Sequence, residues 1–327
     1  MRAGKRWDDR IGRRLKPRDL HILMTVVQCG SMGKAAAQLA VSQSAISKAV
    51  SDIEHTVGVR LLDRTAQGVE PTVYGNTLVK WGTTVFDDLN QAVREIEFLA
   101  DPTAGEVRIG GIEVTMAGLM PAIIDRLSRQ YPRIVFKVVQ ESRNIALQYQ
   151  DLRDRNIDII IGRLPGPITD SDVDVELLFE DPFCIAAGLN SKWQRHRGID
   201  IAELMDEPWA LPSRDTFVGG LFVNWFQSKG LDYPRYTVET TSLQLIEALL
   251  ATGRFLALFS GSALQLSGIR LGLKALPVTS PLPSGPVGIV TLKNRTLSPA
   301  VQLFVDCARE VVMRLAEKSK GAAKRQH

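Results

Sequence analysis

The chain has 327 residues, 45% of them hydrophobic and 23% charged, with 26 glycines and 16 prolines. This composition excludes disordered, collagen-like and disulfide-scaffold proteins, and the length predicts two or three domains. Its three cysteines are scattered, so we expect buried thiols and neither a disulfide nor a metal site. No long apolar run occurs and the first residues are charged, which predicts neither a membrane span nor a secretory signal and hence a cytoplasmic protein.

The net charge of +4 is unevenly distributed. Residues 1–70 carry 12 Lys and Arg against 7 Asp and Glu, and residues 71–327 carry 28 against 29. This asymmetry is typical of a small nucleic-acid-binding module joined to a neutral domain. Residues 1–16 form a basic arm that either adds nonspecific phosphate contacts or is only a solvated leader.

Three amphipathic helices are predicted near the N-terminus. Apolar residues recur at helical spacing in residues 17–29. Ser31 and Ser42 are N-cap candidates for two further helices, over residues 32–39 and 43–57. The tight connection between these two predicts a helix-turn-helix.

The third predicted helix carries candidate DNA contacts. Its first turns hold short polar or cationic residues on the side away from the apolar face, where they can reach base edges and phosphates. These candidates are Ser42, Gln43, Ser44, Ser47 and Lys48. An exposed helix face is usually polar, so it is the position of the cluster, at the start of the second helix of a compact pair, that favours DNA reading.

A short β-wing is predicted after the third helix. Residues 59–64 and 69–72 form two strands around a turn at residues 66–68. Arg64, at the edge of this wing, either binds a phosphate or pairs with Asp63 or another neighbouring acid.

A long helix over residues 72–99 is predicted to mediate dimerisation. One stripe of it holds Leu78, Trp81, Val85, Leu89 and Ile96 at steps of three, four or seven residues. A stripe this long needs a partner, most simply the same helix of a second subunit; the alternative is packing on domains of its own chain. Residues 101–105 then form a hinge.

From residue 106 the pattern is that of an α/β domain with a largely parallel sheet. The chain forms one half, then a second, and returns to the first, so that two crossings define a cleft. The predicted strands are 107–109, 134–139, 157–161, 183–187, 209–211, 236–239, 255–259 and 287–292, and the helices are 119–130, 145–154, 217–229, 242–251 and 300–318.

Polar residues follow several of these strands, where small ligands bind in open α/β sheets. The candidates for effector binding are Thr115, Ser142, Arg143, Asn144, Arg163, Arg214, Thr216, Thr240 and Ser242. Their hydroxyl groups and arginines indicate a small polar ligand such as an organic acid. Glu113 would repel an anion unless an arginine neutralises it, so a sugar stays open.

No enzyme signature is present. The four histidines lie far apart, and the chain has no HExxH, Walker or GxSxG motif. We therefore expect no catalytic activity, no metal and no cofactor.

The run GSMGKAAAQLAVSQSAISKAVSDIEHTVGVRLLDRT, residues 30–65, resembles the DNA-binding domain of the LysR-type transcriptional regulators. The sequence departs from the usual pattern at Ser44, Lys48 and Leu62, and the first two could alter which bases are read. The later segments GGIEVTMAGLMPAIIDRLSRQYP, IDIIIGR and GRFLALFS resemble the effector-binding domain of the same family, which is similar to type 2 periplasmic binding proteins.

The resemblance implies a sequence-specific regulator whose assembly on double-stranded DNA is modulated by an effector in the cleft. It places the candidates on the third helix in the major groove, Arg64 on the DNA backbone, and a homodimer or homotetramer on the long helix. RNA polymerase is a further candidate partner. A solute-binding module is the alternative, which DNA binding by residues 1–100 would exclude.

The implied fold is a winged helix-turn-helix, a linker helix and a two-subdomain α/β effector domain. The predicted boundaries are 1–16 for the arm, 17–71 for the DNA-binding domain, 72–100 for the linker, 101–318 for the effector domain and 319–327 for a tail. Subdomain I would comprise 106–165 and 285–318, and subdomain II 180–280.

Overall fold

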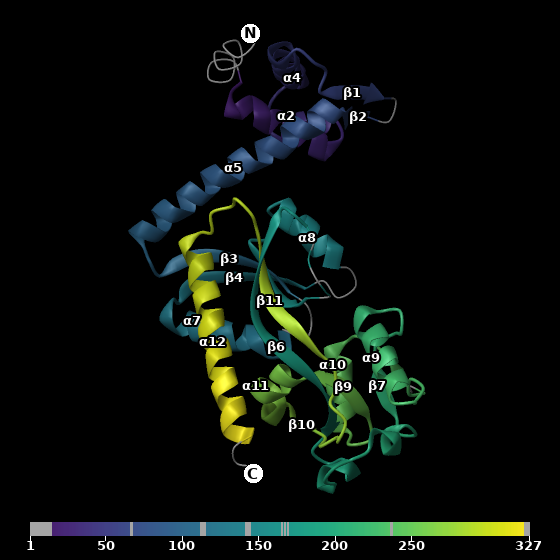
Figure 1. The fold of residues 1–327 in the computed structure, drawn as a ribbon. Coiled ribbons are helices and arrows are strands. Elements are labelled where there is room, and N and C mark those ends of the chain that lie inside the picture. The colour runs from purple at the N-terminus through teal and green to yellow at the C-terminus, as the bar shows by residue number, and fades with distance from the viewer. Residues whose placement is uncertain are drawn as a thin grey trace, which may run out of the picture. The chain divides into compact units, whose positions relative to one another are not determined.

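The computed structural model describes residues 15–65, 68–111, 116–140, 145–164, 166, 168, 170–235 and 238–323. The chain divides into two compact units (Figure 1), one ending at Ala92 and the other beginning at Val93. The boundary falls inside one long helix, α5 (Val73–Ala100).

Ahead of α5, the described part of the first unit holds three helices and a two-stranded wing. They are α2 (Pro17–Cys29), α3 (Met32–Gln38), α4 (Gln43–Val57), β1 (Leu62–Thr65) and β2 (Gly68–Pro71). The helix-turn-helix prediction is therefore confirmed, although the first wing strand begins three residues later than expected. The antiparallel wing pairs Arg64 with Val69.

Local interactions set the helix ends in this unit. The hydroxyls of Ser31 and Ser42 accept hydrogen bonds from the backbone N–H groups at Lys34 and Ala45, as N-caps do. Gly30 ends α2 in the left-handed conformation that favours glycine, with φ of 61°. The helices then bury a shared apolar core, whose fully enclosed members include Leu23, Val26, Ala35 and Ile46.

The second unit consists of two subdomains. Subdomain I contains the parallel strands β3 (Ala104–Gly111), β4 (Arg133–Gln140) and β5 (Ile159–Arg163), with helices α7 (Leu119–Gln130), α8 (Ile145–Arg153) and α12 (Pro299–Ala323). Figure 1 shows α7 and α12 side by side. Apolar side chains of β3, α7 and α12, including Ile109, Ile123 and Phe304, form its core.

Subdomain II contains a second parallel set. It comprises β7 (Trp209–Leu211), β8 (Val238–Glu239), β9 (Leu256–Ser260) and β10 (Leu273–Ala275), with α9 (Phe217–Ser228), α10 (Leu243–Ala251) and α11 (Gly261–Leu271). Strands β8 and β9 flank β7 in parallel. Strand β10 pairs instead with the crossing strand β6 (Val173–Gly188), to which it runs antiparallel. An aromatic cluster of Trp209, Phe222 and Phe226 fills the core.

Two antiparallel strands pass between the subdomains. Strand β6 (Val173–Gly188) pairs first with β11 (Ser284–Leu292) and then, from Phe183 onward, with β9. The nine-stranded sheet therefore runs β4-β3-β5-β11-β6-β9-β7-β8, with β10 beside β6.

The two-subdomain α/β prediction is confirmed, but several details of it are wrong. The sheet is mixed rather than largely parallel, because both crossing strands run antiparallel to their neighbours. Strand β6 begins ten residues before the predicted 183–187, since its first half pairs with β11. Helix α11 and strand β10 were not predicted, and Ala104 and Gly105 of the expected hinge belong to β3.

Candidate DNA-contacting surface and effector site

The start of α4 has a polar face on one side and an apolar face on the other. Gln43, Ser44 and Lys48 are exposed, whereas Ile46 and Val50 are buried in the core. None of the described residues covers this polar side, whereas the opposite side is packed in the core.

Ser42 and Ser44 also have local partners. The Ser42 hydroxyl accepts a hydrogen bond from the Ala45 N–H at 3.2 Å, and the hydroxyls of Ser42 and Ser44 share one at 2.9 Å. Capping therefore uses part of the hydrogen-bonding capacity of Ser42 and keeps the first turn of α4 in place.

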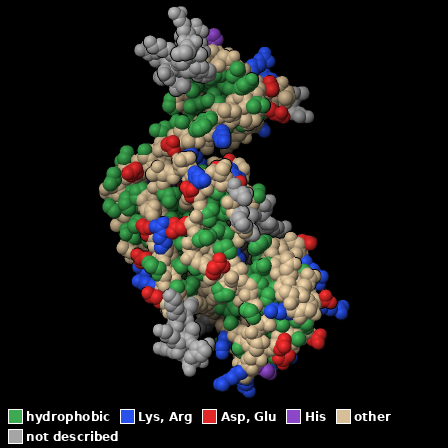
Figure 2. Space-filling view, in the orientation of Figure 1, with side chains coloured by type: hydrophobic (Ala, Val, Ile, Leu, Met, Phe, Trp, Pro, Cys, Tyr) green, Lys and Arg blue, Asp and Glu red, His purple; other side chains and the backbone are tan. Residues whose placement is uncertain are grey.

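The wing brings Arg64 to α4. Its Nη2 donates to the Ser47 hydroxyl at 3.4 Å. Glu54 of α4 holds the start of the wing, because its carboxylate accepts hydrogen bonds from the N–H groups of Leu61 and Leu62 at 2.8 and 3.2 Å. Within the described residues the side-chain contact of Arg64 is the one to Ser47, and no ion pair with an acid is found there. Figure 2 shows Lys and Arg side chains at the end of this unit that carries α4 and the wing.

The predicted dimerisation stripe on α5 is largely exposed. Relative exposure is 62% for Trp81, 42% for Val85, 51% for Leu89 and 66% for Ile96. Figure 2 shows hydrophobic side chains on the surface of the region that carries α5. Leu78 differs from these four residues, because it is partly buried against the core of the DNA-binding unit, on which the first turns of α5 lie. Its place in a dimer stays a prediction.

Four predicted effector residues lie outside the described part of the chain. They are Thr115, Ser142, Arg143 and Asn144.

The structure places four more at two helix starts in subdomain II. Thr216 and Ser242 are the N-caps of α9 and α10, bonded to the N–H groups of Gly219 and Leu245. Thr240 accepts a hydrogen bond from the Ser242 N–H at 3.0 Å, and the exposed Arg214 lies 5.2 Å from the ring centre of Tyr233. Two of these hydroxyls are therefore partly committed to capping.

Arg163 has a different environment from the one predicted. It is 6% exposed, and its Nη2 forms an ion pair with Asp181 at 3.0 Å. Burial lowers the pKa of Arg163, and the charges of Asp181 and Glu180 oppose that effect. The guanidinium is thus engaged inside the protein instead of being presented to a ligand.

Neither a metal site nor a membrane-spanning helix is found among the described residues. No group of three or more His, Cys, Asp or Glu side chains among them could hold a metal ion. None of the helices in that part of the chain combines the length and apolar character that crossing a membrane requires.

Comparison with known families decides the identity. Residues 17–76 match the bacterial regulatory helix-turn-helix protein of the lysR family, and residues 100–313 match the LysR substrate binding domain. The chain belongs to the LysR family of transcriptional regulators. It is a DNA-binding transcriptional regulator with an effector-binding domain.

Relatives and solved structures agree with this assignment. The chain is 27% identical over 297 residues to the HTH-type transcriptional regulator GbpR of Azospirillum brasilense, covering 90% of this chain and 86% of that protein. It is also 27% identical over 297 residues to YdcI of Escherichia coli, an uncharacterised HTH-type regulator, covering 91% and 96%.

The fold is that of full-length LysR regulators. A variant of full-length OxyR from Pseudomonas aeruginosa superposes with a TM-score of 0.61 at 24% identity, covering 90% of this chain and 95% of that one. Full-length CbnR in complex with its target DNA gives 0.52 at 17% identity, covering 91% and 100%. Regulators of this family bind DNA, form oligomers and respond to small molecules.

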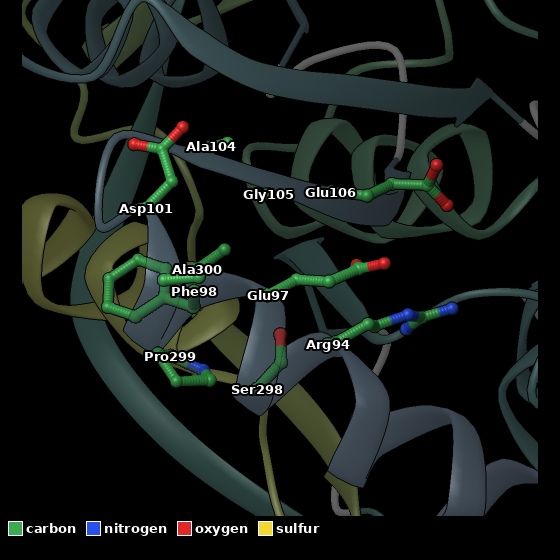
Figure 3. Close-up of a pocket in the computed structure, with 11 residues that line it drawn as sticks. Arg94, Glu97, Phe98, Asp101, Ala104, Gly105, Glu106, Ser298, Pro299 and Ala300 are labelled. Atoms are coloured by element: carbon green, nitrogen blue, oxygen red, sulfur yellow. The ribbon is translucent and has the colours of Figure 1, made fainter.

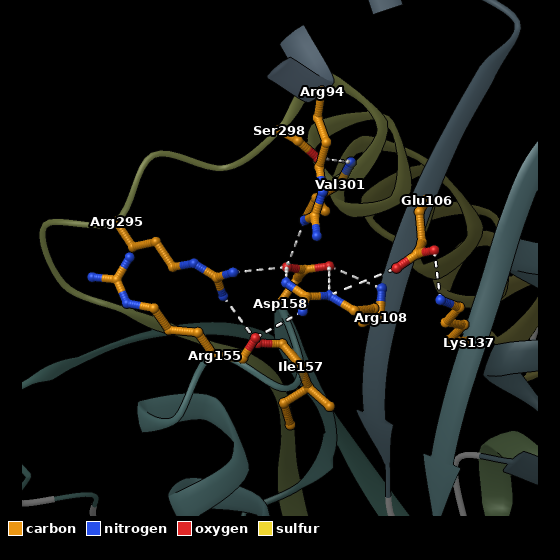
Figure 4. A network of polar contacts seen from close by, with 10 residues as sticks. All are labelled: Arg94, Glu106, Arg108, Lys137, Arg155, Ile157, Asp158, Arg295, Ser298 and Val301. Carbon is orange, nitrogen blue, oxygen red and sulfur yellow. Dashed lines mark hydrogen bonds and ion pairs between the residues drawn. The ribbon is translucent and has the colours of Figure 1, made fainter. Parts of the chain in front are cut away.

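The regulator contains a buried charged cluster that the sequence analysis missed (Figure 4). Asp158, only 1% exposed, accepts hydrogen bonds from the backbone N–H, Nε and Nη2 of Arg108 and from Nη2 of Arg295. Nη1 of Arg94, near the end of α5, lies 3.7 Å from the same carboxylate. Burial opposes ionisation of Asp158, but Arg108 and Arg295 prevail and lower its pKa below the ordinary 3.8.

Gln148 is a second residue that was missed. It is 1% exposed, its Nε2 donates to the Gly111 carbonyl at the end of β3 at 2.8 Å, and its Oε1 has no hydrogen-bond partner among the described residues. The sequence pattern could have identified Gln148, because it is a polar residue on the face of α8 that also carries the buried Tyr149 and Leu152.

A cavity of about 550 Å³ lies in the effector-binding unit beside the end of α5 (Figure 3). Its lining combines the last turns of α5, the start of β3 and the start of α12. Arg94 is accompanied there by the acids Glu97, Asp101 and Glu106.

Proposed function

We propose that α4 reads the bases of a major groove with Gln43, Ser44, Ser47 and Lys48, while Arg64 of the wing holds a phosphate. The observation that supports this most directly is the 3.4 Å contact between Arg64 and Ser47, which joins the wing and the polar face of α4 into one surface. Ser42 contributes through its capped first turn and through any hydroxyl capacity that capping leaves.

The exposed stripe of α5 supports a symmetric dimer. Pairing would bury Trp81, Val85, Leu89 and Ile96. Two α4 helices would then enter major grooves about one helical turn, or a multiple of it, apart on a near-palindromic site. A tetramer built from two such dimers, in contact with RNA polymerase, would regulate transcription in the cytoplasm, where bacterial DNA lies. No catalytic step belongs to this proposal.

DNA-binding measurements with single variants test the surface. Replacing Gln43→Ala is expected to weaken specific binding by about 1–3 kcal/mol and to relax base preference, because one base-edge contact is lost. Replacing Arg64→Ala is expected to weaken binding to all DNA sequences similarly. It should also reduce the dependence of affinity on salt concentration (the salt slope) by about one phosphate contact.

Lys80→Ala is the matched control, since it removes an exposed charge of the same unit outside α4 and the wing. An unchanged sequence preference in Gln43→Ala, together with an unchanged salt slope in Arg64→Ala, would reject this assignment.

We further propose that a small organic acid or sugar binds between the subdomains. The carboxyl ends of β5 and β9 both reach Asp181 at the crossing, so the strand ends of the two subdomains converge there. The residues that we assign to the ligand are Thr115, Ser142, Arg143, Asn144, Arg214, Thr216, Thr240 and Ser242. For Arg163 we propose instead an indirect role.

A thermal-shift screen of small acids and sugars tests the effector site. A compound that stabilises the wild type should stabilise Arg214→Ala and Thr240→Ala less, because each loses a ligand contact. Full retention of the stabilisation in both variants would place the ligand elsewhere.

A further inference from the structure

The strands that join the two subdomains meet a cluster of four polar side chains. Arg163 ends β5 in subdomain I, Asp181 lies on the crossing strand β6, Ser260 ends β9 in subdomain II, and Ser262 lies in the first turn of α11. These four residues are the crossing cluster. Their exposure does not exceed 9%, so the contacts among them are largely shielded from solvent.

Arg163 connects subdomain I to both crossing strands. Its Nη1 donates to the Asp181 carbonyl of β6 at 2.7 Å and to the Gly285 carbonyl of β11 at 3.1 Å. Its guanidinium carbon also lies 4.0 Å from the ring centre of Phe183, a core residue of subdomain II. A single side chain therefore contacts both strands where they pass from one subdomain to the other.

The Asp181 carboxylate connects the crossing to subdomain II. Its Oδ2 accepts hydrogen bonds from Arg163 Nη2 at 3.0 Å, from the Ser260 hydroxyl at 2.5 Å and from the Ser262 hydroxyl at 2.8 Å. Its Oδ1 accepts the Ser262 backbone N–H at 2.9 Å. The chain's own carboxylate thus occupies the N-terminal end of α11, where an anion is favoured.

We propose that the crossing cluster positions the two subdomains relative to each other and so sets the geometry of the effector site. Arg163 and Asp181 act through the crossing strands rather than by touching the effector. Each is a buried charge whose partner lies on another element, so removing one leaves the other uncompensated and forces the crossing to rearrange. The inference rests on the proposed effector site only for the function that it gives the crossing cluster. The relative position of the two subdomains is measured without an effector.

Spin-label distance measurements on the full chain test the proposal. One label is placed at Ser128→Cys in α7 and the other at Lys229→Cys after α9, both exposed. Burial raises the pKa of Cys184 to about 12 and also raises the pKa of Cys307. The thiolate is the reactive form, so both shifts slow labelling. Cys184 is nevertheless only partly buried, so Cys29 and Cys184 are both replaced, whereas the buried Cys307 is kept. Labelled chains are diluted with unlabelled ones so that each assembly carries one labelled copy.

Asp181→Asn and Arg163→Met are expected to broaden or shift the distance distribution relative to the wild type. Arg295→Met is the matched control, since it breaks an equally buried pair, Arg295 with Asp158, away from the crossing. It is expected to lower the melting temperature and leave the distribution unchanged. If the crossing variants unfold, Ser260→Ala, which removes one neutral hydroxyl, should give a smaller change in the same direction.

A distribution unchanged in every crossing variant that folds, despite a lowered melting temperature, would reduce the cluster to a structural role and overturn the proposal. A change of the same size in Arg295→Met would overturn it as well. If no compound in the effector screen stabilises the protein but the crossing variants alter the distance distribution, the proposed effector is rejected and this inference stands.

Discussion

Replacing Asp158→Asn should destabilise the effector-binding unit strongly. The four hydrogen bonds of this carboxylate divide evenly: Oδ2 accepts the N–H and Nε of Arg108, at 2.9 and 3.2 Å, and Oδ1 accepts Nη2 of Arg108 and of Arg295, at 2.6 and 2.9 Å. Asparagine keeps one oxygen and turns the other into an NH₂ donor, so two of the four bonds are lost.

The expected cost follows from those two bonds. Hydrogen bonds to a charged group contribute about 1.5–3 kcal/mol each, so the loss is about 3–6 kcal/mol. Breaking a buried ion pair costs about 3–5 kcal/mol in general, which agrees. For a unit of this size about 1 kcal/mol corresponds to a shift of about 2–4 °C in melting temperature.

The pH dependence gives a second, independent signature. Because Arg108 and Arg295 outweigh burial and lower the pKa of Asp158 below 3.8, its charge stabilises the fold fully above that ordinary value. This contribution is lost as the pH falls through the lower folded-state pKa. The free-energy difference between wild type and Asp158→Asn should therefore be largest at neutral pH and shrink well below pH 3.8.

Urea denaturation followed by circular dichroism at neutral and acid pH measures both effects. Asp170→Asn is the control, because it removes a 48% exposed carboxylate paired with Arg153 and should cost no more than about 1 kcal/mol. A loss in Asp158→Asn as small as in the control, or one that does not change with pH, would refute the reasoning.

Two further substitutions address the DNA-binding unit and α5. Leu89→Glu should dissociate the dimer in sedimentation measurements by placing a charge in the apolar stripe, whereas Asn90→Glu, one residue away and off the stripe, should leave it intact. Gly75→Ala should lower the free energy of unfolding by about 1–3 kcal/mol, because an added methyl group would overlap the Leu61 carbonyl oxygen. Gly33→Ala, a helical position where the added methyl group would meet only Gln43 Oε1 at 3.7 Å and Ser31 Oγ at 3.8 Å, should instead raise it by up to about 1 kcal/mol. Equal effects of the two changes would contradict this account.

The sequence predicted most of the DNA-binding unit because its signals are local. Serine caps and glycine ends lie within four residues of the backbone groups that they satisfy, so Ser42 and Gly58 bound α4 as expected. Leu78, which the sequence pattern assigns to the dimer stripe, also packs partly on the core of its own unit. Helical periodicity shows that a face is apolar, but not whether its own domain or a partner covers it.

Predictions in the effector-binding unit were weaker where partners lie far apart in the chain. Arg163 follows a predicted strand and therefore looked like a ligand contact. Its carboxylate partner lies 18 residues later, and the serines on that carboxylate come about 80 residues after it. Asp158 likewise meets Arg295 across 137 positions.

Sequence alone thus determined the family, the helix-turn-helix and the alternation of strands and helices, since each depends on short-range spacing. Only the tertiary structure decided which strands cross between the subdomains and which charges are buried there. Those outcomes depend on the register of β6 against β11 and β9, which brings together side chains that no local pattern relates.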